Sequence, residues 1–108
     1  MKKLLVRYKV KANKAQENEQ LVQEVYEQLH KKKVEGFHYI TFKLKDGVSF
    51  VHIAFADREG ANTEFSSLPA FKSFQADLKA RCEEPPVVTP ITVLGSYDFI
   101  KSEIQPQK

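Results

Sequence analysis

ITFKLKDGVSFVHIAF, residues 40–55, joins two β-rich runs through the dipeptide Asp46-Gly47. Asp-Gly between such runs predicts a β-hairpin with a two-residue type I′ turn, because both central residues of that turn need positive φ. A two-residue turn at this point would pair Lys45 with Val48, and that pair fixes the register further along both strands. The sequence therefore predicts two antiparallel strands with a defined set of cross-strand partners.

This register would place two chemically different sets of side chains on opposite faces, because side chains alternate along a strand. One face is almost wholly apolar and pairs Leu44 with Ser49, Phe42 with Val51, Ile40 with Ile53, and His38 with Phe55. The other face is mixed and pairs Lys43 with Phe50, Thr41 with His52, and Tyr39 with Ala54. We expect helices to cover the apolar face, which would leave the mixed face free for binding.

Composition places the chain among ordinary globular proteins. Its 108 residues, 42% of them hydrophobic and 29% charged, predict a single domain over residues 1–108, with 103–108 as a loose tail. The formal net charge of +3 comes from basic residues interleaved with acidic ones, so we do not expect a nucleic-acid surface. A single cysteine, no signal-peptide pattern and no apolar run near the ~20 residues of a membrane span predict a cytoplasmic protein without a membrane partner.

The first half of the chain alternates a strand with a helix before the hairpin. Residues 4–12 alternate apolar and basic side chains, which indicates a half-buried strand. Apolar residues at helical spacing predict a helix over about residues 15–33. Asn13 is the expected N-cap, and Gly36 is the expected stop.

The second half predicts one more helix and one more strand. Residues 57–66 indicate a polar connection. Ser67 would cap a helix that has Pro69 in its first turn. The buried stripe of that helix would be Phe71, Phe74, Leu78 and Cys82. Pro85 and Pro86 would end the helix, and a final β-branched strand would follow over residues 87–100.

The resulting order is β-α-β-β-α-β, which predicts an α+β ferredoxin-like sandwich. Its antiparallel sheet has the strand order 4-1-3-2, with both helices on one face. We expect Val6, Tyr8 and Val10 to lie under the helices together with the apolar face of the hairpin. Arg7 would then share the opposite, mixed face with His52.

The mixed face contains Tyr39 and Phe50, and an aromatic patch rimmed by polar groups is typical of an interface or a binding groove. The last strand would lie at a sheet edge, where it could extend the sheet into a second subunit. We therefore expect a homodimer formed through sheet faces and strand four, because isologous dimers are the commonest oligomers.

The chain resembles the dimeric α/β-barrel superfamily, and within it the small proteins related to antibiotic-biosynthesis monooxygenases. The resemblance extends from Val6 to about Tyr97. It rests on three segments, VRYKVK at residues 6–11 running into a glutamate-rich helix, DGVSFVH at residues 46–52, and LPAFKSF at residues 68–74. The last of these is similar to the Leu…Pro-x-Phe-x-x-Phe pattern at the start of the second helix in those proteins.

The resemblance implies a dimer of ferredoxin-like units that binds small apolar ligands in a cleft between sheet and helices. Some members oxygenate aromatic polyketides without metal or flavin, and others degrade haem. The characterised oxygenases of both kinds rely on a tryptophan together with an asparagine, and the haem degraders add a histidine ligand. This chain has no tryptophan, so neither mechanism and no catalytic residue transfers to it by motif.

The residues themselves support one hypothesis for an active site. His52 could polarise or deprotonate a small aromatic or quinol-type substrate. Arg7 could steady developing negative charge, and Tyr39, Thr41 and Phe50 could shape the pocket. The enzyme would then be a monooxygenase-like oxidoreductase that needs no cofactor. In the alternative, His52 is a hydrogen-bonded residue at a dimer interface and the protein is a non-catalytic ligand-binding or assembly domain.

The remaining motifs favour plainer interpretations. His30, His38 and His52 lack ligand spacing, and His38 points away from His52, so we expect no metal site. Cys82 is interpreted as a small buried hydrophobe. RNA-recognition domains share this element order and are a remote alternative, with Phe50 near their third-strand motif but Val48 where a stacking aromatic is expected.

Overall fold

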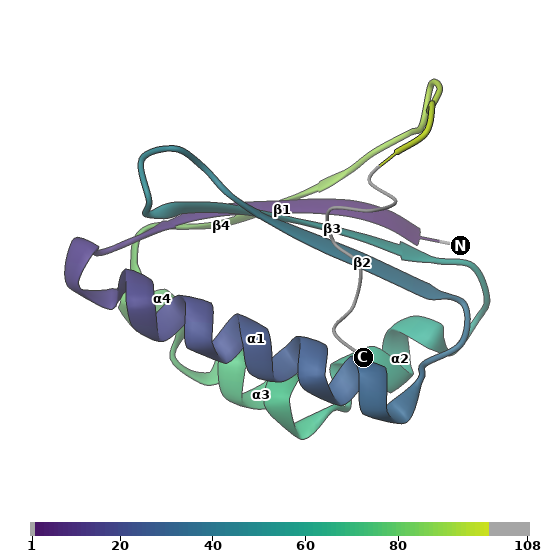
Figure 1. Ribbon diagram of the computed structural model, residues 1–108, viewed down its shortest axis with the longest axis horizontal. Coiled ribbons are helices and arrows are strands. Elements are labelled where there is room, and N and C mark those ends of the chain that lie inside the picture. The colour runs from purple at the N-terminus through teal and green to yellow at the C-terminus, as the bar shows by residue number, and fades with distance from the viewer. Residues whose placement is uncertain (1, 100–108) are drawn as a thin grey trace.

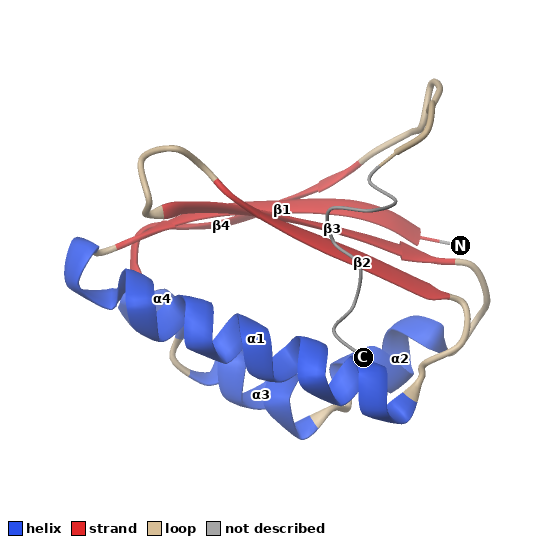
Figure 2. Cartoon of the chain, viewed as in Figure 1, coloured by secondary structure: helices blue, strands red, loops and turns tan. Residues whose placement is uncertain are grey.

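The computed structural model describes residues 2–99 and contains a four-stranded antiparallel sheet with helices against one face (Figure 1). The strands are β1 (Lys2–Val10), β2 (Phe37–Lys43), β3 (Ser49–Ala56) and β4 (Cys82–Pro90). The helices are η1 (Ala12–Lys14), α1 (Ala15–Lys32), α2 (Ala61–Ser66), α3 (Pro69–Ala76) and α4 (Leu78–Arg81). The strands lie in the order β2-β3-β1-β4, so the predicted α+β ferredoxin-like fold is confirmed. Figure 2 shows its two layers, one of strands and one of helices.

The register within the hairpin is the predicted one, but the turn is not. Leu44 N donates to Ser49 O at 2.9 Å and Gly47 N donates to Leu44 O at 3.0 Å, so residues 45–48 form the loop. Gly47 has φ of 77°, whereas Asp46 is not in the positive-φ region, which rules out a type I′ turn. The Asp46 carboxylate instead accepts hydrogen bonds from the backbone N–H groups of Val48 and Ser49. The longer loop still has an even number of residues, which preserves the pairing.

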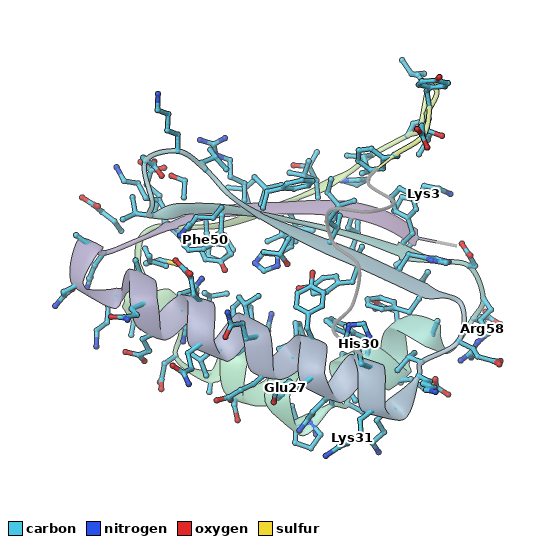
Figure 3. The ribbon with its side chains drawn as sticks, viewed as in Figure 1. Lys3, Glu27, His30, Lys31, Phe50 and Arg58 are labelled. Atoms are coloured by element: carbon cyan, nitrogen blue, oxygen red, sulfur yellow. The ribbon has the colours of Figure 1, made fainter. Side chains whose placement is uncertain are left out.

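The prediction of which hairpin face lies under the helices is wrong. β1 pairs with β3 so that Val6 lies opposite His52 and Tyr8 opposite Phe50. Tyr8 is buried beneath the helices as expected, and Phe50 and His52 are therefore buried with it. Figure 3 shows Phe50 between the sheet and the helix layer. The opposite side, called here the outer face, carries Leu5, Arg7, Ile40, Phe42, Val51, Ile53 and Phe55.

Two physical reasons account for the inversion. The mixed face contains the large rings of Tyr39 and Phe50, which bury more apolar area than the aliphatic side chains of the outer face. Its polar members find partners inside the protein, since Thr41 and His52 bond to each other and to tyrosine hydroxyls. A polar group that is hydrogen-bonded costs little to bury.

A short helix occupies the segment predicted to be a polar connection. α2 covers the end of that segment, and its residues Ala61 and Phe65 are buried. The Phe65 ring stacks on Phe37 with centroids 4.3 Å apart and lies 4.4 Å from the ring of Phe71. Phe65 therefore packs α2 against Phe37, the first residue of β2.

The last strand begins earlier than predicted. α3 ends at Ala76, and α4 is one short turn. Cys82 is the first residue of β4, although the sequence predicted that it would be the last buried residue of a helix. Pro85 and Pro86 lie inside β4, which is tolerated because β4 is an edge strand whose register shifts between Arg7 and Lys9 of β1. Residues 91–99 continue beyond β4 and rise away from the sheet (Figure 1). Residue 100, the expected end of this strand, and the proposed tail at 103–108 lie outside the described residues.

The predicted cap of the first helix is also wrong. Asn13 lies within η1, and no side chain caps α1. The helix ends at Lys32, followed by Lys33 in the left-handed region at φ of 56°. His30, Lys31 and Lys32 occupy its last turn, where positive charge complements the helix dipole. None of the helices within residues 2–99 combines the length and apolarity needed to cross a bilayer.

Replacing Phe65 with alanine should lower the free energy of unfolding by about 3–5 kcal/mol, because it opens a cavity where three aromatic rings meet. Urea unfolding at one pH measures this loss. Thr63→Ala, on the exposed side of the same helix, is the control and should change stability by less than about 0.5 kcal/mol. Equal effects of the two substitutions would mean that Phe65 does not anchor α2.

Candidate functional site

A cavity of about 510 Å³ lies between the inner face of the sheet and the helices α2, α3 and α4. Such a volume suits a small organic ligand. Its lining is largely apolar and consists of Leu4, Val6, Tyr8, Tyr39, His52, Ala54, Asn62, Phe65, Ser66, Phe71, Phe74, Gln75, Leu78, Lys79, Pro85, Pro86 and Val88. Lys79 is the only lysine, arginine, aspartate or glutamate in this lining, and it is exposed. Of the polar side chains in the lining, Tyr8 and His52 are buried and Tyr39 is half-buried. These three hydrogen-bonded residues form one polar end of an otherwise largely apolar cavity.

His52 occupies that polar end, and protein hydroxyls meet both of its ring nitrogens. Nε2 lies 2.8 Å from the Tyr8 hydroxyl. Nδ1 lies 2.9 Å from Thr41 Oγ1 and 3.0 Å from the Tyr39 hydroxyl. A ligand in the cavity would therefore meet the histidine through the tyrosines rather than directly.

These contacts belong to a longer hydrogen-bonded row, called here the polar row. It runs from Arg81 through Asn18, Tyr8, His52 and Thr41 to Tyr26, with Tyr39 as a branch at His52. The Asn18 Nδ2 group donates to the Tyr8 hydroxyl at 2.9 Å, and the hydroxyls of Tyr26 and Thr41 are 2.8 Å apart. The row crosses three strands and joins them to α1 and α4.

The strand register brings the centre of the row together. His52 on β3 lies between Val6 of β1 and Thr41 of β2, so Thr41 and His52 are direct cross-strand neighbours. Tyr8 pairs with Phe50 on the same face of the sheet, next to the pair of Val6 and His52. Its ring stacks on His52 with centroids 5.4 Å apart and on Phe50 with centroids 5.6 Å apart. Packing therefore holds the imidazole ring, and hydrogen bonds set its orientation.

Burial keeps the histidine and the tyrosines of the row neutral. Desolvation lowers the pKa of His52 from 6.5 to about 4, so the imidazole is uncharged at neutral pH. Desolvation also raises the pKa of Tyr26 to about 12, and it raises the pKa values of Tyr8 and Tyr39 above the usual value for a tyrosine. At neutral pH the cavity therefore ends in uncharged hydrogen-bonding groups.

Arg81 is the charged member of the row and is 2% exposed. Its Nε and one terminal nitrogen donate to Asn18 Oδ1, and that same terminal nitrogen also donates to Phe74 O at 3.0 Å. The guanidinium carbon lies 5.3 Å from the Phe74 ring centroid. The other terminal nitrogen has no hydrogen-bond partner within the described part of the chain.

The structure brings together four of the five residues proposed from the sequence. His52 and Tyr39 line the cavity, Thr41 bonds to His52, and Phe50 packs under Tyr8. Arg7 does not join them: it pairs with Val51 on the outer face and is exposed. The expected proximity of Arg7 and His52 is wrong, because the β1–β3 register differs by one residue from the one assumed.

Sequence reasoning missed Asn18, Arg81 and Tyr26, and it placed Tyr8 under the helices without including it among the site residues. Asn18 could have been found, because it continues the helical spacing of Val22 and Val25 as a polar residue on a buried stripe. Nothing in the local sequence distinguishes Arg81 from the lysines and arginines that stay exposed.

Within residues 2–99 no group of three or more histidine, cysteine, aspartate or glutamate side chains is arranged to hold a metal ion. His38 faces away from His52, as predicted, and lies 2.7 Å from the Asp57 carboxylate. Phe50 is 2% exposed, so it cannot stack a base as the RNA-binding alternative required. Cys82 is half-buried at the start of β4, where burial raises its thiol pKa.

The fold is shared with proteins described as antibiotic biosynthesis monooxygenases. A candidate enzyme of this kind from Nitrosomonas europaea superposes with a TM-score of 0.71 over 85% of this chain and 88% of its own, at 14% identity. A protein from Mycobacterium tuberculosis gives 0.71 over 87% and 95%, at 16% identity. A cofactor-independent oxygenase from Streptomyces nogalater gives 0.66 over 89% and 95%, at 17% identity. No protein-family profile and no curated protein sequence matches this chain.

The depressed pKa of His52 predicts a pH-dependent stability. The unfolded chain takes up a proton near pH 6.5 and the folded protein near pH 4, so the free energy of unfolding should fall as pH drops through this interval. The loss from this one group should approach about 3 kcal/mol. In His52→Gln that contribution should vanish, so unfolding curves of both proteins between pH 7 and pH 4 isolate it. Parallel pH profiles would contradict the neutral, buried imidazole.

Proposed function

We propose that this protein binds a small aromatic or quinol-type compound in the cavity and acts on it as a cofactor-independent monooxygenase-like enzyme. The observation that carries the proposal is a largely apolar cavity lined at its polar end by Tyr39 and His52, whose hydroxyl and Nδ1 are 3.0 Å apart. The likeness in fold to an oxygenase described as cofactor-independent supports the reaction class.

The chemistry suits a site without charged catalytic groups. An aromatic compound with an activated CH₂ beside its ring system loses a proton to solvent water to give an electron-rich enolate, which reacts directly with O₂ to give a peroxide anion. Solvent returns a proton to that anion. The hydroperoxide formed then loses water, so that R₂CH₂ and O₂ become R₂C=O and H₂O. The protein contributes by orienting the substrate, excluding water and stabilising negative charge on the substrate oxygen.

In this proposal Tyr39 is the residue that contacts the substrate oxygen. Tyr39 lines the cavity, and its hydroxyl is 3.0 Å from His52 Nδ1. His52, with its pKa near 4, is a weak base at neutral pH, so it acts by orienting Tyr39 instead of accepting the substrate proton. Thr41 holds the imidazole from the same side.

We further propose that two copies of the chain associate through the outer face. Its central row consists of Leu5, Ile53 and Ile40, and the neighbouring row consists of Val51 and Phe42. Phe42 is exposed and the other four side chains are partly exposed, so the two rows form an apolar surface. The segment beyond β4 adds exposed apolar side chains, including Leu94 at 98% and Tyr97 at 92% exposed. An apolar surface of this kind is typical of a protein–protein interface. Face-to-face sheets would then cover it.

Oxygen uptake with dithranol, an anthrone with an activated CH₂, tests the enzymatic proposal. Wild-type protein should accelerate uptake above the buffer rate. Tyr39→Phe should lose roughly 10²-fold in rate, the scale for one hydrogen-bond donor to a developing oxyanion. His52→Gln should also lose activity, and Arg7→Ala, altered on the outer face, should keep it.

Two outcomes would count against this assignment. Equal losses in Arg7→Ala and Tyr39→Phe would place the chemistry outside the cavity. Binding of dithranol in the cavity without faster oxygen uptake would favour the alternative, a ligand-binding protein without catalysis. This alternative is favoured by one observation: both ring nitrogens of His52 already have hydrogen-bond partners within the protein.

Association through the outer face predicts that Ile53→Glu, which puts a charge at the centre of the central row, should give monomers. Sedimentation equilibrium of both proteins at micromolar concentration measures this. Lys72→Glu, on the exposed side of α3, is the control and should leave the mass unchanged. A monomeric wild type, or an unchanged mass in Ile53→Glu, would contradict the proposed interface.

A further inference from the structure

The direction of the hydrogen bonds in the polar row can be worked out from one end. Arg81 Nε and a terminal nitrogen lie 3.2 Å and 3.1 Å from the same Asn18 atom, Oδ1. A guanidinium has only donors, so the atom that meets both nitrogens must be the amide oxygen. The orientation of the Asn18 amide is therefore fixed by Arg81, and its NH₂ group faces Tyr8.

The Tyr8 hydroxyl accepts a hydrogen bond from Asn18 Nδ2 at 2.9 Å. Its own proton then has one hydrogen-bond partner left among the described residues, His52 Nε2 at 2.8 Å. If Nε2 carried a proton instead, the buried Tyr8 proton would have no acceptor, at a cost of about 1–3 kcal/mol. Tyr8 therefore donates to Nε2.

A neutral imidazole whose Nε2 accepts a hydrogen bond carries its proton on Nδ1. This N–H points at Thr41 Oγ1 and the Tyr39 hydroxyl, so both oxygens act as acceptors toward His52. The Thr41 hydroxyl can donate its own hydrogen bond to the Tyr26 hydroxyl, 2.8 Å away. The Tyr39 proton has no acceptor within the row and is available to the cavity that Tyr39 lines.

We propose that Arg81 is a remote positioning residue: through Asn18 and Tyr8 it fixes His52 as the Nδ1–H tautomer and makes the Tyr39 hydroxyl a hydrogen-bond donor to the cavity. The site then selects neutral aromatic compounds that place a carbonyl oxygen, a pure acceptor, at the polar end. A compound that needs to donate a hydroxyl proton there binds less well. This ligand preference deepens the proposed function, but the tautomer does not depend on it.

The tautomer is measured directly by long-range ¹H–¹⁵N correlation spectra of the His52 ring. The wild type should show the proton on Nδ1. In Asn18→Asp, nearly the same in shape, both carboxylate oxygens accept, so Tyr8 should turn its proton toward residue 18. His52 should then donate from Nε2, and Nδ1 should become an acceptor for Tyr39. Asn13→Asp, the same change at an exposed position, should leave the wild-type tautomer.

The ligand preference is tested with 1-tetralone, which offers a carbonyl acceptor, and 1-naphthol, which offers a hydroxyl donor. Wild-type protein should bind 1-tetralone about tenfold more tightly, the scale of one net hydrogen bond. Asn18→Asp should lose or reverse this preference, and Asn13→Asp should keep it. Tyr39→Phe should abolish it without altering the His52 tautomer.

Each result decides the inference. A proton on Nε2 in the wild type would overturn it, as would a proton on Nδ1 in both the wild type and Asn18→Asp. If Asn18→Asp fails to fold, the wild-type tautomer and the loss of preference in Tyr39→Phe decide, and an undiminished preference would overturn it. Absence of oxygen uptake with the predicted tautomer and preference intact would refute only the enzymatic proposal.

Discussion

The hydrogen bond between the Tyr8 hydroxyl and His52 Nε2, 2.8 Å long, is the contact on which the rest of this structure depends. It lies in the middle of the sheet, with Asn18 and Arg81 on one side and Thr41, Tyr39 and Tyr26 on the other. Each unpaired group in a buried polar row carries a desolvation cost, and apart from one terminal nitrogen of Arg81 the buried side-chain nitrogens and oxygens of this row have hydrogen-bond partners among the described residues. The row therefore ties the inner face of the sheet to α1 and α4 in one arrangement.

The same row gives the cavity its character. Aromatic and aliphatic side chains close the space around it, and the groups that end it are neutral at physiological pH. Such a site recognises shape and one hydrogen bond, and it does not offer a strong base. This favours chemistry in which the bound compound itself is reactive toward oxygen and the protein orients it. The shared fold is compatible with that chemistry, while the residues that would perform it are this chain's own.

Local sequence was enough to predict the fold and part of the site. The Asp46-Gly47 dipeptide and the alternation beside it determine which residues of β2 and β3 are partners, so Thr41 and His52 could be paired correctly. The face that this pair occupies depends on β1, more than forty residues away, and no local pattern sets that register. The hairpin has an apolar face and a mixed face, and the choice between them rests on the area of the aromatic rings and on how many polar groups find partners inside the protein. The hydrogen bonds between Arg81 and Asn18 could not be predicted locally, because they depend on how α1 and α4 pack on the sheet.

A crystal structure of the protein soaked with 1-tetralone is the most informative experiment, because it shows at once where a neutral aromatic ketone binds and how it is oriented. We expect the ring between the sheet and α3, with the carbonyl oxygen within hydrogen-bond distance of the Tyr39 hydroxyl. A ring bound on the outer face, or one in the cavity with its carbonyl directed at Lys79, would contradict the proposed role of Tyr39.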